Sequence, residues 1–131
     1  MERSLDWLNQ AKRDLEKAAL DIKHTYFEWA CFTAQQSAEK AVKAVYQKLN
    51  MSVKGHSIVR MLEGLNTNKI EVTEELNHLA RILDKYYTVS RYPNGFPEGR
   101  PADFFDEKIG QEALDAAHKI VTWCDDKIST V

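Results

Sequence analysis

Apolar side chains recur along most of this chain every three or four positions, which is the spacing of one face of an α-helix. The first helical pattern covers about residues 4–24, and the second covers about residues 26–50 with Thr25 as its candidate N-cap. Small side chains on a core face let a neighbouring helix approach closely, so Ala34, Ala38 and Ala41 predict tight helix contacts. The predicted core positions of the two segments are Leu5, Leu8, Ala11, Leu15, Ala18, Ala19 and Ile22, followed by Phe27, Ala30, Cys31, Ala34, Ala38, Ala41, Val45 and Leu49.

The middle of the chain predicts one short helix and one longer helix. The short helix begins at Ile58, has Ser57 as its cap, and is expected to end near Gly64. The longer helix follows a cap at Thr73 and extends to about Arg91. Its apolar positions are Leu76, Leu79, Ala80, Leu83, Tyr86 and Tyr87.

A loop of about residues 92–103 holds all three prolines and precedes the last predicted helix, which covers about residues 106–128. Gly110 is a candidate position for a bend in that helix. No strand pattern competes with these helices. The sequence therefore predicts an all-α protein, an up-and-down helical bundle of four long helices plus one short helix, in a single domain over residues 1–131.

Composition and charge limit the classes of function that this protein can have. The chain is 44% hydrophobic and 29% charged, as in ordinary globular proteins. Its formal net charge of -2 argues against a protein that holds long nucleic acid by bulk charge, but it is compatible with a local basic pocket. The chain lacks a run of about twenty apolar residues and begins with a charged amphipathic segment, so we expect a cytoplasmic protein with no membrane contact.

The two cysteines, Cys31 and Cys124, both fall on apolar helix positions. We expect two buried free thiols, because a chain without a secretory signal does not favour a disulfide. The cysteines and histidines do not have the spacings of a zinc site, and no glycine-rich phosphate loop is present. No metal and no cofactor are therefore expected.

Residues 78–101 combine charged, aromatic and turn-forming side chains at one helix end. Asp84, Tyr87 and Arg91 are spaced to lie along one side of the helix over two turns, and Tyr92 follows directly. One interpretation is a salt bridge at the edge of the core, with Arg91 reaching into solvent. The other is a phosphate site, in which the planar guanidinium binds phosphate oxygens and Tyr92 stacks on a base. The spacing leaves both interpretations open.

A second group of polar residues lies on the second predicted helix. Its members are Gln36, Glu39, Lys40 and Lys43. Glu39 and Lys43 form an ordinary i, i+4 pair, which favours a solvated face, and Lys43 is retained as a candidate phosphate ligand. His56 is expected to close the N-terminus of the short helix. The remaining histidines, expected on the surface, are His24, His78 and His118.

Three segments of the chain resemble signatures of the HEPN family. They are residues 26–44 (YFEWACFTAQQSAEKAVKA), the step Gly55-His56-Ser57, and residues 83–94 (LDKYYTVSRYPN). The likeness covers essentially the whole chain, in the family's order and at fitting distances. The resemblance implies a small helical bundle that forms a homodimer. It also implies a prokaryotic stand-alone protein, paired with a minimal nucleotidyltransferase in a toxin–antitoxin arrangement.

Many HEPN domains are metal-independent endoribonucleases whose motif is an Arg followed, after four to six residues, by a His. In this chain Arg91 fills the Arg position, but the next His is His118, far outside that window. The proton-transfer group of the motif is therefore missing. The resemblance consequently favours binding of a nucleotide or an RNA phosphate by Arg91 over cleavage.

Three functional hypotheses remain. The first is a nucleotide- or RNA-phosphate-binding module that partners a nucleotidyltransferase. The second is an endoribonuclease toxin with a variant motif, in which Glu98, His56 or Tyr92 replaces the missing His. The third is a purely structural dimerisation module. The sequence does not decide whether the protein is an enzyme.

The resemblance and the apolar pattern together predict how the protein assembles. Trp29 and Phe32 extend the apolar surface of the second helix beyond one core face, so a homodimer contact is predicted there or on the loop after Arg91. Arg91 is expected to line a cleft near the dimer axis, with Asp84 and Tyr87 beside it. Tyr92 is expected at the rim of that cleft.

Overall fold

The structure is a computed structural model that describes residues 2–131. Its elements are α1 (Ser4–Lys23), α2 (Phe27–Lys48), α3 (Ile58–Thr67), α4 (Glu74–Asp84), α5 (Tyr86–Val89), two short 3-10 helices, η1 (Pro93–Gly95) and η2 (Pro101–Phe104), and α6 (Glu107–Thr130). No strand occurs in the described residues, so the predicted all-α class is confirmed. No helix in this range combines the length and hydropathy that a membrane span requires.

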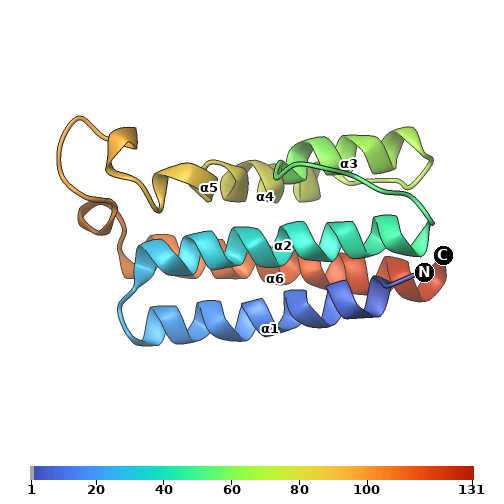
Figure 1. The fold of residues 1–131 in the computed structure, drawn as a ribbon, viewed down its shortest axis with the longest axis horizontal. Coiled ribbons are helices and arrows are strands. Elements are labelled where there is room, and N and C mark those ends of the chain that lie inside the picture. The colour runs from blue at the N-terminus through green and yellow to red at the C-terminus, as the bar shows by residue number, and fades with distance from the viewer. Residues whose placement is uncertain (1) are drawn as a thin grey trace.

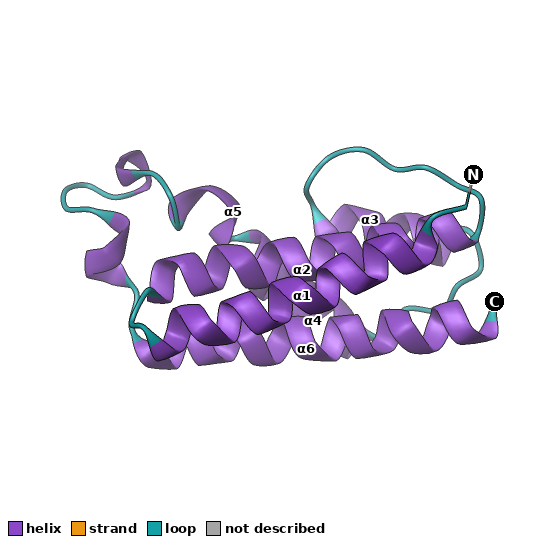
Figure 2. Cartoon of the chain, turned by 60° about the horizontal axis from the view of Figure 1, so that its bottom comes forward, coloured by secondary structure: helices purple, strands orange, loops and turns teal. Residues whose placement is uncertain are grey.

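Helix α2 occupies the middle of the bundle. It packs against α1 and α6 on one side and against α3, α4 and α5 on the other (Figure 1). The chain ends of the described part lie at one end of the bundle, and the loop between α5 and α6 projects from the opposite end (Figures 1 and 2). Because α2 has neighbours on both sides, side chains around much of its circumference are buried.

The predicted long helix of residues 74–91 is two helices in the structure. Helix α4 ends at Asp84, and α5 covers only Tyr86–Val89. Lys85 between them keeps helical dihedral angles, φ -66° and ψ -17°, so the interruption is local and the chain direction is nearly maintained. Helices α4 and α5 together occupy the place of the predicted fourth long helix.

Two predicted helix boundaries need correction. Helix α3 does not end at Gly64 but continues to Thr67. Gly64 instead makes room for Tyr46, whose hydroxyl fills the space that a Cβ at Gly64 would need. That hydroxyl donates a hydrogen bond of 2.6 Å to the Met61 carbonyl. Thr25 does not cap α2: it has a φ of 67°, and the N-cap is Tyr26 without a side-chain hydrogen bond. Helix α6 runs through the buried Gly110 as one helix.

The core confirms most of the predicted apolar positions. Ala34, Ala38 and Ala41 have no exposed surface, and the Ser37 hydroxyl between them donates to the Ala11 carbonyl at 2.6 Å. Leu5 was predicted in the core but is 63% exposed, in the first turn of α1. The predicted core residue Ala19 is exposed as well.

Both cysteines are buried and free, as predicted. Burial raises the pKa of the Cys31 thiol to about 12, and it also raises the pKa of Cys124. The thiolate is the reactive form of cysteine, so neither side chain is poised for chemistry near neutral pH.

Asp84 fastens the N-terminus of α3 to the end of α4. One carboxylate oxygen accepts from the Ile58 amide at 2.9 Å, and the other accepts from the Val59 amide at 2.9 Å and the Ser57 hydroxyl at 3.1 Å. Ser57 also accepts from the Arg60 amide at 3.2 Å, which confirms it as the N-cap of α3. A carboxylate at this position satisfies two orphan amides and complements the helix dipole.

We expect Ala38→Leu to lower the free energy of unfolding by about 1–3 kcal/mol, because the added side chain overpacks a fully buried contact. Urea unfolding measures the change. Ala19→Leu is the matched control: Ala19 is exposed on α1, so its replacement should stay within about 0.5 kcal/mol of the parent. Equal stability of the two variants would contradict the packing of α2.

We expect Asp84→Ala to cost about 2–3 kcal/mol of stability, because it leaves the first amides of α3 without their charged partner. Asp84→Asn is the matched variant, since it keeps one acceptor oxygen and should lose less. Amide hydrogen exchange at Ile58 and Val59 should accelerate in Asp84→Ala. Unchanged exchange at both amides would show that this contact does not hold α3.

Candidate functional site

Arg91 is held in place by its own helix and by three aromatic rings. Its Nε and Nη2 atoms donate to the Tyr87 carbonyl at 3.0 and 2.6 Å. The guanidinium carbon lies 4.2 Å from the ring centre of Phe32, 4.8 Å from that of Tyr87 and 5.1 Å from that of Tyr92. Arg91 therefore has little rotamer freedom left to lose on contact with a ligand.

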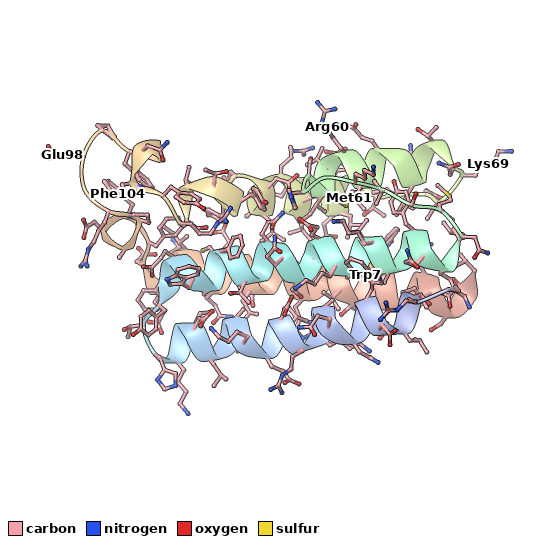
Figure 3. The ribbon with its side chains drawn as sticks, in the orientation of Figure 1. Trp7, Arg60, Met61, Lys69, Glu98 and Phe104 are labelled. Atoms are coloured by element: carbon pink, nitrogen blue, oxygen red, sulfur yellow. The ribbon has the colours of Figure 1, made fainter. Side chains whose placement is uncertain are left out.

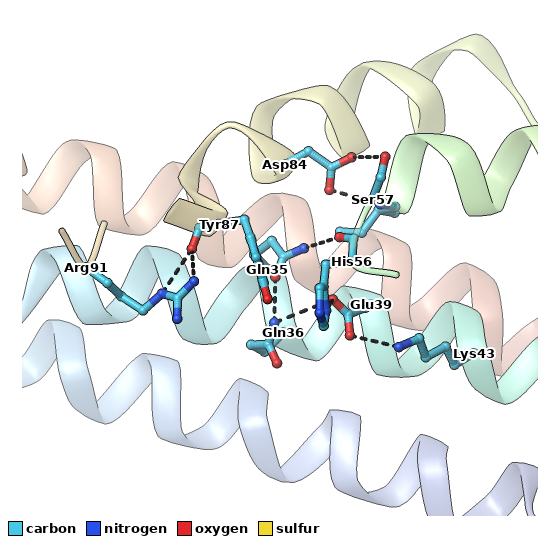
Figure 4. A network of polar contacts seen from close by, with 10 residues as sticks. Gln35, Gln36, Glu39, Lys43, His56, Ser57, Asp84, Tyr87 and Arg91 are labelled. Atoms are coloured by element: carbon cyan, nitrogen blue, oxygen red, sulfur yellow. Dashed lines mark hydrogen bonds and ion pairs between the residues drawn. The ribbon is translucent and has the colours of Figure 1, made fainter. Parts of the chain in front are cut away.

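The charge of Arg91 has no acidic partner. No ion pair formed within residues 2–131 includes it, so the salt bridge that the sequence allowed is absent. Asp84, expected beside Arg91, instead directs both oxygens to the start of α3 (Figure 4). Nη1 makes no hydrogen bond, and no buried side-chain polar atom of the described part lacks a partner, so Nη1 reaches the surface. The guanidinium thus presents one free edge and an unbalanced positive charge.

The polar residues of α2 are not the solvated face that the sequence favoured. The side chain of Glu39 is only 5% exposed and that of Lys43 is 16% exposed. Glu39 Oε2 accepts from Lys43 Nζ at 3.1 Å, and Glu39 Oε1 is 3.1 Å from Nδ1 of His56. Lys40 pairs instead with Asp14 of α1 at 2.6 Å. Glu39 is buried beside His56, which leads into α3, whereas Lys40 and Lys43 contact Asp14 and Trp7 of α1.

His56 belongs to this polar group and does not close α3, since Ser57 and Asp84 do so. Gly55 precedes it with a φ of 95°, a conformation that favours glycine, and turns the chain toward α2. The His56 ring then stacks on Tyr87 with ring centres 4.6 Å apart and planes 16° apart. The sequence could not reveal this pairing, because the residues are far apart along the chain.

A buried glutamine that the sequence analysis missed positions His56. Gln35 has no exposed surface, and its Nε2 donates to the His56 carbonyl at 2.8 Å. Gln36 donates to Oε1 of Gln35 at 2.8 Å, which extends the network along α2 (Figure 4). The available signal was an amide side chain directly after the core residue Ala34, a place where burial requires a hydrogen-bond partner.

Tyr87 joins the two parts of the site. Its ring lies between the guanidinium of Arg91 and the ring of His56 (Figure 4). Of the sequence-predicted residues, Arg91, Tyr87 and Tyr92 are therefore brought together. Lys43 lies farther along α2, held between Glu39 and the ring of Trp7.

Two grooves of the described chain lie away from Arg91. One of about 600 Å³ lies between α4 and α6, and one of about 470 Å³ lies beside the connection of α1 and α2. Arg91 lines neither of them. Within residues 2–131 no group of His, Cys, Asp or Glu side chains is arranged to hold a metal ion.

The sequence and the fold both match known proteins. The sequence profile of the HEPN domain matches residues 4–127. The crystal structure of TT1696 from Thermus thermophilus has 38% identity and a TM-score of 0.93, covering 97% of this chain and 99% of that one. No curated protein matches the chain.

Two further solved structures carry the family's name. ST0689, described as an archaeal HEPN homologue, has 38% identity and a TM-score of 0.83, covering 98% of this chain and 99% of that one. The HEPN domain protein tm0613 from Thermotoga maritima has 35% identity and a TM-score of 0.79, covering 96% and 99%. With the profile match over nearly the full length, these likenesses show that the chain belongs to the HEPN family.

Proposed function

We propose that this protein is a nucleotide- or RNA-phosphate-binding HEPN module, and that Arg91 is its phosphate ligand. The observation that carries the proposal is the state of the Arg91 side chain. Its position is fixed by the Tyr87 carbonyl and the rings of Phe32, Tyr87 and Tyr92, while its charge is left without a carboxylate. An anionic ligand would supply the missing partner.

The chemistry of the side chain favours a phosphate. A guanidinium is a planar fork that matches phosphate oxygens, and a charge-assisted hydrogen bond is stronger than a neutral one. Because Arg91 is already ordered, binding costs little side-chain entropy. Tyr92 is 50% exposed beside it and offers a ring face to the base or sugar of the ligand.

A variant ribonuclease is the second candidate, and one observation favours it. Among the residues considered as substitutes for the motif His, His56 contacts the same Tyr87 ring as Arg91 does. Glu98, in contrast, lies at the outer edge of the projecting loop (Figure 3). We nevertheless expect weak or no metal-independent RNA cleavage, because the His of the motif after Arg91 is absent. Strong cleavage by the parent that Arg91→Ala abolishes would replace the binding proposal by this one.

The proposal includes a homodimer and, from the family resemblance, a nucleotidyltransferase partner. Co-purification with a nucleotidyltransferase encoded by a neighbouring gene would test that partner. Exposed aromatic rings support the dimer: Trp29 is 46% exposed, and Tyr26, Tyr92 and Phe104 are exposed as well. The loop between α5 and α6 projects from the same end of the bundle as the connection of α1 and α2 (Figure 1). An aromatic surface of this kind is typical of a protein contact.

We expect the parent to be dimeric at micromolar concentration in light scattering, and Trp29→Glu to be monomeric, because a charge in the contact would have to be desolvated. Leu5→Glu is the matched control: Leu5 is exposed in the first turn of α1, and α1 begins at the opposite end of the bundle (Figure 1). Its replacement should leave the dimer intact. A monomeric parent would contradict the dimer.

We expect Arg91→Ala to weaken binding of AMP or of a short single-stranded RNA about tenfold to a hundredfold, the value of one charge-assisted contact. Arg91→Lys should restore binding only in part, because it lacks the fork. Isothermal titration calorimetry measures the affinities, and thermal unfolding checks that each variant is folded.

Arg13→Ala is the control, since Arg13 is an exposed arginine on α1 and its loss should leave affinity unchanged. If Arg91→Ala bound AMP as tightly as the parent did, Arg91 would be a structural residue and the proposed function would be wrong.

A further inference from the structure

We propose that His56 accepts a hydrogen bond from the ribose 2′-hydroxyl of the ligand whose phosphate Arg91 binds, so that the site selects ribonucleotides over deoxyribonucleotides. The inference rests on the proposed function, because it needs a phosphate on Arg91. It adds the class of ligand and the residue that recognises the sugar.

The hydrogen-bond partner of His56 determines which ring nitrogen carries the proton. Nδ1 lies 3.1 Å from Oε1 of Glu39, and a carboxylate only accepts hydrogen bonds. Nδ1 of the neutral ring must therefore donate, which leaves Nε2 as an acceptor with a free lone pair. Lys43 balances the charge of Glu39 from the other oxygen, at 3.1 Å.

The acceptor atom is both fixed and accessible. Gln35 holds the His56 backbone through its carbonyl, and the stack on Tyr87 fixes the plane of the ring. The side chain is nevertheless 55% exposed, and Nε2 has no hydrogen-bond partner within residues 2–131. An ordered acceptor without a protein partner is suited to a hydroxyl donor from a ligand.

The placement of His56 relative to Arg91 indicates which sugar hydroxyl of the ligand donates the hydrogen bond. The two groups flank the same ring, because the centre of the Tyr87 ring lies 4.6 Å from that of His56 and 4.8 Å from the guanidinium carbon of Arg91 (Figure 4). In a nucleotide, the sugar hydroxyls lie a comparably short distance from the phosphate of the same residue. The ribose 2′-hydroxyl is also the group by which a protein tells RNA from DNA. A ligand that crosses the edge of Tyr87 would place its phosphate on Arg91 and its ribose on His56.

The test compares the affinities of AMP, 2′-deoxy-AMP and 3′-deoxy-AMP by isothermal titration calorimetry. We expect the parent to bind AMP about twofold to tenfold more tightly than 2′-deoxy-AMP, the value of one neutral hydrogen bond, and to bind 3′-deoxy-AMP as tightly as AMP. CMP and its deoxy forms should give the same ratio, because the contact is to the sugar. A ratio that appears with AMP alone would place the contact on the base and overturn the inference.

Two variants test whether Nε2 of His56 causes the difference in affinity between AMP and its deoxy analogue. His56→Phe keeps an aromatic ring on Tyr87 but has no acceptor, so AMP and the deoxy analogue should bind with equal affinity. Arg91→Ala should weaken both ligands by the same factor and leave their ratio unchanged. His78→Ala is the control, because His78 is exposed on α4 and its replacement should change neither affinity nor ratio. Thermal unfolding checks that His56→Phe is folded.

The outcomes separate the two proposals. If the parent binds AMP through Arg91 but binds 2′-deoxy-AMP as tightly as AMP, the ribose contact is wrong and the phosphate site stands. Discrimination that survives in His56→Phe would likewise overturn the role of His56. If Arg91→Ala leaves AMP affinity unchanged, the phosphate site is wrong and the inference built on it falls too.

Discussion

The burial of α2 on both of its sides is the constraint on which the rest of the structure depends. Its small residues, Ala34, Ala38 and Ala41, are fully buried where α1 and α6 approach it. The opposite side is covered by α3, α4 and α5, so the polar side chains there cannot all turn to water. Buried polar groups need partners, and Gln35 and Glu39 find theirs in the segment that leads into α3.

That constraint produces the ordered geometry of the candidate site. Gln35 and Glu39 hold His56 through its backbone and its ring nitrogen, and His56 stacks on Tyr87. Tyr87 in turn holds Arg91 through its carbonyl and its ring. A half-buried guanidinium and an exposed imidazole are thus rigid because they are attached to a buried network. Rigid groups lose little entropy when a ligand binds. Asp84 supports the arrangement by keeping α3 docked at the end of α4.

Local features of the structure could be predicted from the sequence. The caps at Ser57 and Thr73 were found because a capping hydrogen bond spans only three residues, to Arg60 and Leu76. Thr25 has the same hydroxyl side chain as those caps but adopts a φ of 67° after the end of α1, so the residue type alone led to a wrong prediction of a cap. The end predicted at Gly64 failed for a related reason: the glycine makes room for Tyr46 and does not terminate the helix.

The sequence by itself determined which segments are helical, which faces are apolar, and that Arg91, Tyr87 and Tyr92 lie close together. Helical spacing shows which residues share a face, because that depends only on neighbours along the chain. Only the tertiary structure decided what lies against each face. It buried the pair of Glu39 and Lys43, and it placed the Asp84 carboxylate at the N-terminus of α3. It also brought His56 to the ring that Arg91 contacts. The contacts of Asp84 and His56 join segments far apart in sequence, and the packing of α3 to α5 on α2 sets them.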